Sequence, residues 1–118
     1  MKNKQMQQKL IIDTDPGIDD AMAIHYAFAH PGLDVLGLTT IFGNVFVPQA
    51  TRNALLLSEQ AHYCVDVAEG AAQPLMQSLN PPSHHVHGAE GFGDVPVKQP
   101  CGTPVEMSAV DYIVKTCR

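Results

Sequence analysis

Short apolar runs alternate along this chain with segments in which apolar residues recur at helical spacing. The run over residues 35–42 is continuous rather than alternating, which is typical of a parallel strand covered on both faces. The other strand-like runs are 9–12 and 63–68, and the helical segments are 18–30 and 48–60. We therefore predict an α/β fold with an open parallel sheet, right-handed crossovers and the Rossmann-like order βαβαβ.

A further helix is predicted after a long loop. Thr103 and Glu106 have the spacing of a capping box, and Pro104 suits the first helical position. The residues expected to face the core from the three helices are Ala21, Ile24 and Phe28, then Ala50, Ala54, Leu57 and Ala61, and finally Val110, Ile113, Val114 and Cys117.

Composition limits the classes of protein that remain. Hydrophobic residues make up 45% and charged residues 16% of the chain, which favours a single globular domain over residues 1–118. Its polar start, residues 1–8, is expected to be flexible, and residues 70–100 are expected to form the long loop. The net charge of −5 argues against nucleic acid as a partner.

The apolar runs and the cysteines indicate where the protein works. No apolar run is long enough for a membrane-spanning helix or a secretory signal, so no membrane partner is expected. Cys64, Cys101 and Cys117 have no CxxC spacing, which favours small buried side chains over a disulfide framework. A reducing cytoplasm is therefore the expected location.

Four aspartates gather where the first predicted strand meets the first predicted helix: Asp13, Asp15, Asp19 and Asp20. Carboxylates this close repel one another, and a hard divalent cation with oxygen ligands would relieve that repulsion. Alternatively, Asp15 or Asp19 caps the helix and the others are solvated, although a cap needs only one carboxylate. We interpret the cluster as metal-binding or catalytic.

The ten residues 12–21, IDTDPGIDDA, resemble the amino-terminal signature of the nucleoside hydrolases, the inosine-uridine preferring N-ribohydrolases. The resemblance continues in the segments 39–45, 50–54, 86–93 and 109–114. It covers nearly the whole chain after the first eight residues. The resemblance implies that the fold is the amino-terminal portion of the nucleoside hydrolase fold.

The family resemblance also implies an activity, which is the Ca²⁺-dependent hydrolysis of the N-glycosidic bond of ribonucleosides to free base and ribose. Asp15 and Asp20 would be Ca²⁺ ligands, and Asp19 would accept a proton from the water bound to the metal and touch a ribose hydroxyl. Asn44 would bind the ribose, and Asp13 would hold the loop from behind the metal ligands. Clustered carboxylates suit this reaction because positive charge develops on the sugar.

Asn44 and His87 are both candidate contacts of the nucleoside, and each has a plain alternative. Asn44 offers the donor and acceptor that sugar hydroxyls need, but its position after Gly43 also suits a turn or a helix cap. His87, with His84 and His85, lies in the long loop. That loop is either solvated or a lid that brings His87 nearest the nucleoside.

Members of the family are well over twice as long as this chain. The resemblance therefore implies an incomplete hydrolase domain, and activity is expected of a longer protein rather than of these 118 residues alone. It also implies that the longer protein is a homo-oligomer and works in purine and pyrimidine salvage. One alternative is an inactive truncated fold that binds metal weakly or associates through its open sheet edge. A haloacid-dehalogenase-type phosphatase also places Asp-x-Asp after its first strand, but gives Asp19 and Asp20 no role. The preferred base is not indicated by the sequence.

Overall fold

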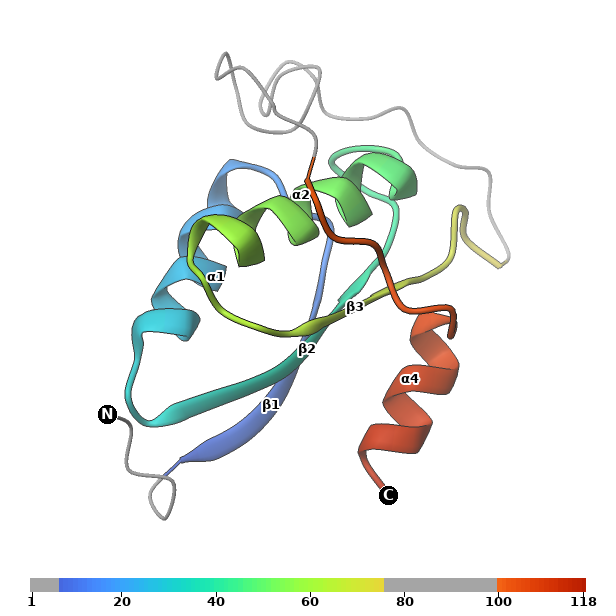
Figure 1. Ribbon diagram of the computed structural model, residues 1–118. Helices are drawn as coiled ribbons and strands as arrows, with labels where there is room; N and C mark the ends of the chain where they lie inside the picture. Colours follow the sequence, from blue (N-terminus) through green and yellow to red (C-terminus); the bar gives the residue numbers. More distant parts are fainter. Residues whose placement is uncertain (1–6, 76–99) are drawn as a thin grey trace.

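The computed structural model describes residues 7–75 and 100–118, and the strands in this part form one parallel sheet in the order β1-β2-β3 (Figure 1). The elements are β1 (Gln8–Thr14), α1 (Ile18–Ala29), β2 (Leu33–Thr40), α2 (Val47–Gln60), β3 (Asp66–Glu69) and α4 (Ala109–Thr116). The predicted α/β fold, the open parallel sheet and the βαβαβ order are confirmed. The predicted polar start and long loop fall largely outside the described residues.

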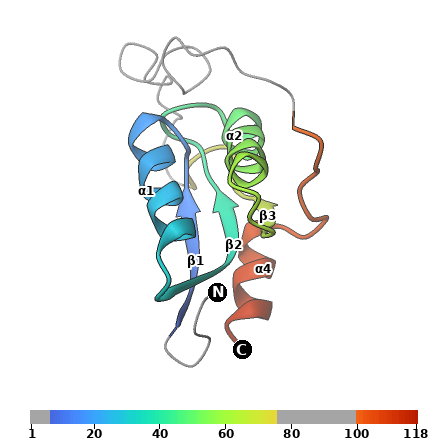
Figure 2. The same cartoon turned by 60° about the vertical axis from the view of Figure 1, so that its left-hand side comes forward.

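The sheet lies between two layers of helices. Helices α1 and α2 cover one face, and α4 lies against the other (Figures 1 and 2). Val67 and Ala68 are neighbours in β3 but belong to different core clusters, because successive side chains of a strand point to opposite faces. The larger cluster, on the side of α1 and α2, consists of Ile24, Ala27, Phe28, Val35, Leu38, Ala54, Leu57 and Val67.

Helices α1 and α2 begin and end close to the predicted positions, and most of their predicted core residues are buried. Ala21 and Ala61 are half-buried, whereas the other five are buried. The ring of Phe28 in α1 stacks on Tyr63 with 4.3 Å between the ring centroids. The Tyr63 hydroxyl accepts a hydrogen bond of 3.1 Å from the Val35 backbone N–H. The turn after α2 is thereby fixed against both α1 and β2.

The prediction for the last helix was wrong at its start. Helix α4 begins at Ala109, and its N-cap is Ser108, whose hydroxyl accepts a hydrogen bond from the Asp111 backbone N–H. The capping box at Thr103 does not form because this segment lies along the edge of β3. There the Val105 backbone N–H donates to the Val67 carbonyl over 2.8 Å. A contact far away in the sequence outweighs the local capping pattern.

The predicted core stripe of α4 was wrong too. Its buried residues are Ala109 and Tyr112, whereas Val110, Ile113, Val114 and Cys117 are exposed. The Tyr112 ring packs over Gly37, where an added Cβ would lie 2.2 Å from the Tyr112 oxygen. The Tyr112 hydroxyl also donates toward the Leu36 carbonyl over 3.2 Å. These contacts turn the Tyr112 side of α4 to the sheet and the other apolar residues outward.

Three smaller expectations are corrected by the structure. Cys64, Cys101 and Cys117 are all exposed and free, because they lie in connections or at a helix end rather than under the sheet. Strand β3 begins at Asp66 instead of residue 63, because the Tyr63 backbone continues the turn after α2 and bonds to Ser58. Strand β2 ends at Thr40, two residues before its predicted end. Within residues 7–75 and 100–118, no helix is long and apolar enough to cross a membrane.

Candidate functional site

Residues 13–20, which contain the four aspartates and are called the acidic segment below, lie at the edge of the sheet where β1 and β2 end. The parallel register pairs Asp13 with Thr39 and Thr14 with Thr40, so both strands end at the same edge of the sheet. The connection from β1 to α1 therefore meets the connection from β2 to α2. Open α/β sheets bind their ligands at this edge, where the loops after the strands converge.

Asp15 and Asn44 join these two connections directly. The Asn44 backbone N–H donates to the Asp15 carboxylate over 2.7 Å. Gly43 makes this approach feasible: its φ of +156° is unfavourable for other residues, and an added Cβ would lie 2.1 Å from the same carboxylate oxygen. Asn44 does not cap α2, whose N-cap residue is Phe46. The helix-cap alternative for Asn44 is therefore wrong, although Asn44 does lie in a bend of the chain.

Asp13 and Asp20 are each held by a threonine hydroxyl. The Thr39 hydroxyl in β2 donates to Asp13 over 2.7 Å, and the Thr14 hydroxyl donates to Asp20 over 2.6 Å. The first bond ties the end of β1 to β2. The second fixes the first turn of α1 against the end of β1. Hydrogen bonds of this kind hold a carboxylate in one orientation.

Helix α1 begins without a carboxylate cap. Its N-cap is Gly17, which has no side chain, and no side-chain hydrogen bond caps the helix. Asp19 and Asp20 lie in the first turn, where the helix dipole favours negative charge, and the Asp19 side chain is exposed. The alternative in which Asp15 or Asp19 caps α1 is therefore wrong. These carboxylates are left available for another role.

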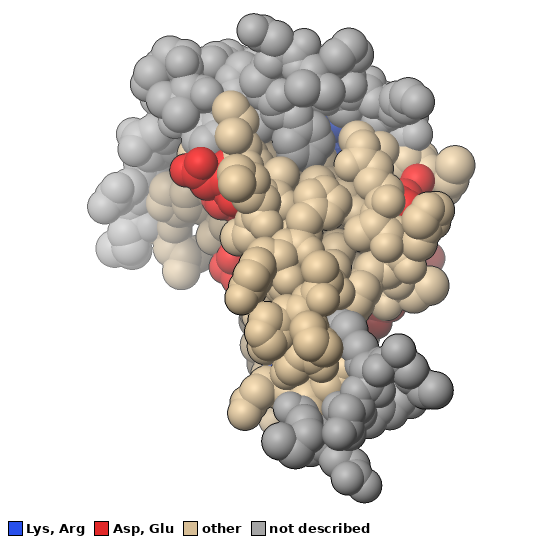
Figure 3. Space-filling model, turned by 90° about the vertical axis from the view of Figure 1, so that its left-hand side faces the viewer, with Lys and Arg blue, Asp and Glu red and all other residues tan. Residues whose placement is uncertain are grey.

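The electrostatics of the site centre on Asp15. Burial raises the pKa of its carboxyl above the ordinary value, and the nearby charge of Asp20 raises it further, while the Asn44 N–H opposes both effects. On the face of the molecule shown in Figure 3, acidic side chains are visible in several places and hardly any lysine or arginine of the described residues is exposed. The raised pKa of Asp15 therefore reflects its burial and the neighbouring charge of Asp20.

Two adjacent carboxylates are suitable oxygen donors for a hard divalent cation. Among residues 7–75 and 100–118, no group of three or more His, Cys, Asp or Glu side chains is placed to hold a metal ion. Asp15 and Asp20 could thus supply only part of the six to eight oxygen ligands that Ca²⁺ takes. His84, His85 and His87 lie outside the described residues.

Sequence reasoning missed the polar groups behind the aspartates. Thr40 and Thr51 share a buried hydrogen bond of 2.8 Å, and the fully buried Asn53 donates to the Pro16 carbonyl over 3.1 Å. One signal was present in the sequence, because Thr39 and Thr40 interrupt an otherwise apolar run and Asn53 lies on the apolar face of α2. Buried polar side chains need partners, so these residues could have been linked to the site.

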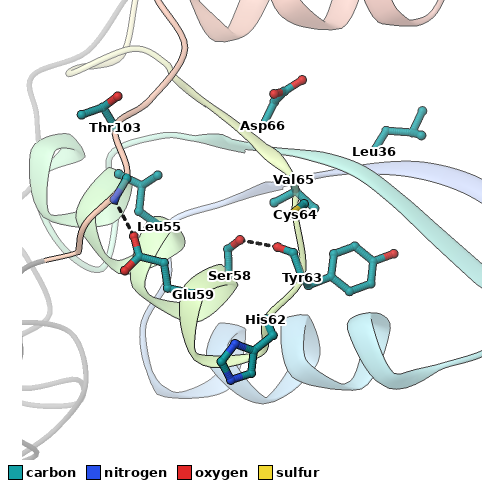
Figure 4. A pocket seen from close by; sticks show the side chains of 11 residues that line it. Leu36, Leu55, Ser58, Glu59, His62, Tyr63, Cys64, Val65, Asp66 and Thr103 are labelled. Atoms are coloured by element: carbon teal, nitrogen blue, oxygen red, sulfur yellow. Dashed lines mark hydrogen bonds between the residues drawn. The ribbon is translucent and has the colours of Figure 1, made fainter.

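A cavity in the described part lies away from the acidic segment. It has a volume of about 660 Å³ and lies between the end of α2, residues 62–66 and residues 102–103. Figure 4 shows Glu59 at this cavity, bonded to the backbone N–H of Gly102 over 2.7 Å. The cavity contains none of the aspartates of the acidic segment among its lining residues. The candidate active site is therefore the sheet edge and not this cavity.

Residues 10–118 match the family model described as inosine-uridine preferring nucleoside hydrolase. The chain belongs to this nucleoside hydrolase family. Uridine nucleosidase 1 of Arabidopsis thaliana is 52% identical over 107 residues, which cover 90% of this chain and 32% of that protein. The inosine-uridine preferring nucleoside hydrolase of Leishmania major is 42% identical over 91 residues, which cover 76% of this chain and 29% of that protein.

Solved structures agree with this assignment. A plant nucleoside hydrolase superposes with a TM-score of 0.87 at 46% identity, covering 92% of this chain and 35% of that chain. A purine-preferring ribonucleoside hydrolase from Gardnerella vaginalis gives the same TM-score at 34% identity, with coverage of 92% and 36%. The chain thus has the amino-terminal part of the nucleoside hydrolase fold and spans about a third of the length of these relatives.

Proposed function

We propose that the protein containing this chain hydrolyses the N-glycosidic bond of ribonucleosides to free base and ribose. The observation that carries the proposal is the contact between the Asp15 carboxylate and the Asn44 backbone, with Asp20 beside it. This contact unites the acidic segment with Asn44, whose amide can pair with sugar hydroxyls. Uridine and inosine are the first substrates to test, because relatives are named for uridine and for inosine-uridine hydrolysis.

The proposal includes a Ca²⁺ ion held by Asp15 and Asp20. Their carboxylates lie together at the sheet edge, and Thr14 and Asn44 orient them by hydrogen bonds. When bound, a cation of this kind lowers the pKa of a coordinated water and helps to neutralise the two carboxylates. Because the described residues supply only two such carboxylates, further oxygen ligands would come from other parts of the protein.

Asp19 is the proposed catalytic base, and Asn44 and His87 are proposed to contact the nucleoside. Asp19 is exposed at the first turn of α1, from which it can accept a proton from the attacking water and touch a ribose hydroxyl. Water forms the new bond to the anomeric carbon while the bond to the base nitrogen breaks, and that nitrogen takes up a proton. Asp13, bonded to Thr39, is proposed to hold the acidic segment in place.

The location and assembly of the protein are proposals as well. The three cysteines are free and exposed, which suits a reducing cytoplasm, where thiols stay unpaired. Nucleoside hydrolysis there would serve purine and pyrimidine salvage. We also propose that the whole protein is a homo-oligomer, which light scattering coupled to size-exclusion chromatography would test.

The test is the release of ribose from uridine and inosine by the natural protein, with Ca²⁺ and after its removal by a chelator. Asp19→Ala should lower kcat by about 10²–10⁴-fold, the usual contribution of a general base. Asp111→Ala is the matched control, because Asp111 is also an exposed aspartate in the first turn of a helix, but in α4. Full activity of Asp19→Ala would contradict the assigned base. Absence of ribose release with Ca²⁺ present would contradict the function.

A further inference from the structure

Asn53 is a polar side chain in the middle of α2 that no solvent reaches. Its exposed fraction is 0%, and its Nδ2 donates to the Pro16 carbonyl over 3.1 Å. Pro16 is itself almost completely buried and follows Asp15 directly. Loss of a hydrogen bond from a buried amide costs about 1–3 kcal/mol, so the bond to Pro16 stabilises Asn53 at this position. Asn53 therefore links α2 to the turn that carries Asp15.

Arg52 determines which way the Asn53 amide points. The guanidinium Nε and Nη2 of Arg52 lie 3.3 Å and 3.0 Å from the Asn53 Oδ1 and donate to it. If the amide were rotated by half a turn, its NH₂ group would face these donors and its oxygen would face the Pro16 carbonyl. Both contacts would then be repulsive, since donors would meet donors and an acceptor would meet an acceptor. Arg52 thus keeps the Asn53 donor directed at Pro16.

The turn between β1 and α1 is consequently held from two sides. Asn53 holds the Pro16 carbonyl from the side of α2, and the Asn44 N–H holds the Asp15 carboxylate from the β2–α2 connection. Helix α1 follows at once, with the Ala21 N–H bonded to the Gly17 carbonyl over 3.0 Å. A shift of the Pro16 carbonyl would therefore move Asp15 together with the first turn of α1, where Asp19 and Asp20 lie.

We propose that Asn53, oriented by Arg52, is a positioning residue that sets the Asp15 carboxylate relative to Asn44 and to the first turn of α1. This inference rests on the proposed function, in which Asp15 holds the metal ion. Asn53 acts through the turn and not on the substrate. Partners of this kind, which orient the metal ligands, typically change metal affinity by about 10–100-fold when they are removed.

Asn53→Leu is the test variant, because leucine has a similar size but cannot donate to the Pro16 carbonyl. The matched control is Thr51→Val, at a second buried polar residue of α2, two positions away. Thr51 bonds to Thr40 and to the Val47 carbonyl instead of the turn. Both variants remove a buried hydrogen-bonding group, so a general loss of stability would affect them alike.

The first readout is metal-free and follows hydrogen exchange of the Asn44 amide in the natural protein without Ca²⁺. Exchange should become at least about 10-fold faster in Asn53→Leu, because the displaced Asp15 no longer accepts this N–H, and should stay unchanged in Thr51→Val. The second readout is Ca²⁺ binding by calorimetry, for which we expect about 10-fold weaker affinity in Asn53→Leu only. At saturating Ca²⁺ the kcat should recover toward the wild-type value.

Arg52→Met provides a second variant that keeps Asn53 and removes the guanidinium that orients its amide. We expect the same changes in exchange and affinity, but smaller. Unchanged Asn44 exchange in Asn53→Leu would overturn the positioning role, as would equal effects in Thr51→Val. If the wild-type protein binds no Ca²⁺, the Ca²⁺ site of the proposed function is contradicted. The exchange experiment needs no Ca²⁺, so it still decides whether Asn53 positions Asp15.

Discussion

Gly43 is the residue whose replacement tests the geometry of the candidate site most directly. In Gly43→Ala, the new Cβ would lie 2.1 Å from an Asp15 carboxylate oxygen, whereas ordinary contact begins at 3.4 Å. The same oxygen accepts the Asn44 N–H over 2.7 Å. The carboxylate therefore has to retreat and give up this bond, or the loop around Gly43 has to move.

The free-energy cost has two parts. A residue with a side chain at a φ of +156° costs about 1–3 kcal/mol in backbone strain. The lost hydrogen bond to a charged group is worth about 1.5–3 kcal/mol, and the lower end applies because Asp15 is only half-buried. We expect Gly43→Ala to lower the free energy of unfolding by about 3 kcal/mol.

Urea denaturation measures this loss, with Gly32→Ala as the matched control. Gly32 also lies in a connection outside the helices, but its φ is not in the left-handed region and its added Cβ would meet only the His30 ring, at 3.0 Å. If the imidazole turns away, it gives up the Gly32 N–H that its Nδ1 accepts over 2.9 Å, which is a neutral hydrogen bond, so the control should lose no more than about 1 kcal/mol. Equal losses in both variants would refute the close approach of Asp15 to the Gly43–Asn44 backbone.

Two further predictions concern contacts away from the aspartates. The backbone N–H groups of Cys101 and Gly102 hold the pKa of Glu59 below its ordinary value of 4.5. Glu59 therefore stabilises the fold above that pH, and this contribution is lost as the pH falls through the lower folded pKa. Glu59→Gln should thus lose less stability than wild type on acidification below pH 4.5, and parallel acid profiles in urea denaturation would contradict this. Gly37→Ala should cost about 1–3 kcal/mol of unfolding free energy through overpacking against the Tyr112 ring, and combining it with Tyr112→Leu should cost less than the sum of the two single changes. An additive double-mutant cycle would argue against this contact.

The sequence predicted the first two helices well because the signals that mark them lie within the helices themselves. Apolar spacing defined α1, and Pro48 marked the start of α2 to within one residue. The last helix was different. The capping box at Thr103 does not form because the Val105 backbone bonds to Val67 instead. The packing of Tyr112 on Gly37 determines which side of α4 is buried. Neither contact can be read from a window of neighbouring residues.

The candidate site shows the same division. The four aspartates and their position after the first strand were evident in the sequence because they are close together in it. Their partners were not, because Thr39 lies 26 residues from Asp13 and Asn53 lies 37 residues from Pro16. Only the register of β1 on β2 and the packing of α2 bring these groups together. Sequence reasoning therefore found the charges but not the hydrogen bonds that arrange them.

The way α4 reaches the sheet has a consequence for the order of folding. The strands pair across single crossovers, with Gln8 against Leu33 and Gly37 against Asp66, whereas Tyr112 meets Leu36 across 76 residues of chain. Closing a longer loop costs more entropy, so we expect the βαβαβ unit to form first and α4 to dock last. Asp15 and Asp20 are then forced together early, before α4 stabilises the sheet. A cation that binds at that stage would accelerate folding as well as stabilise its product.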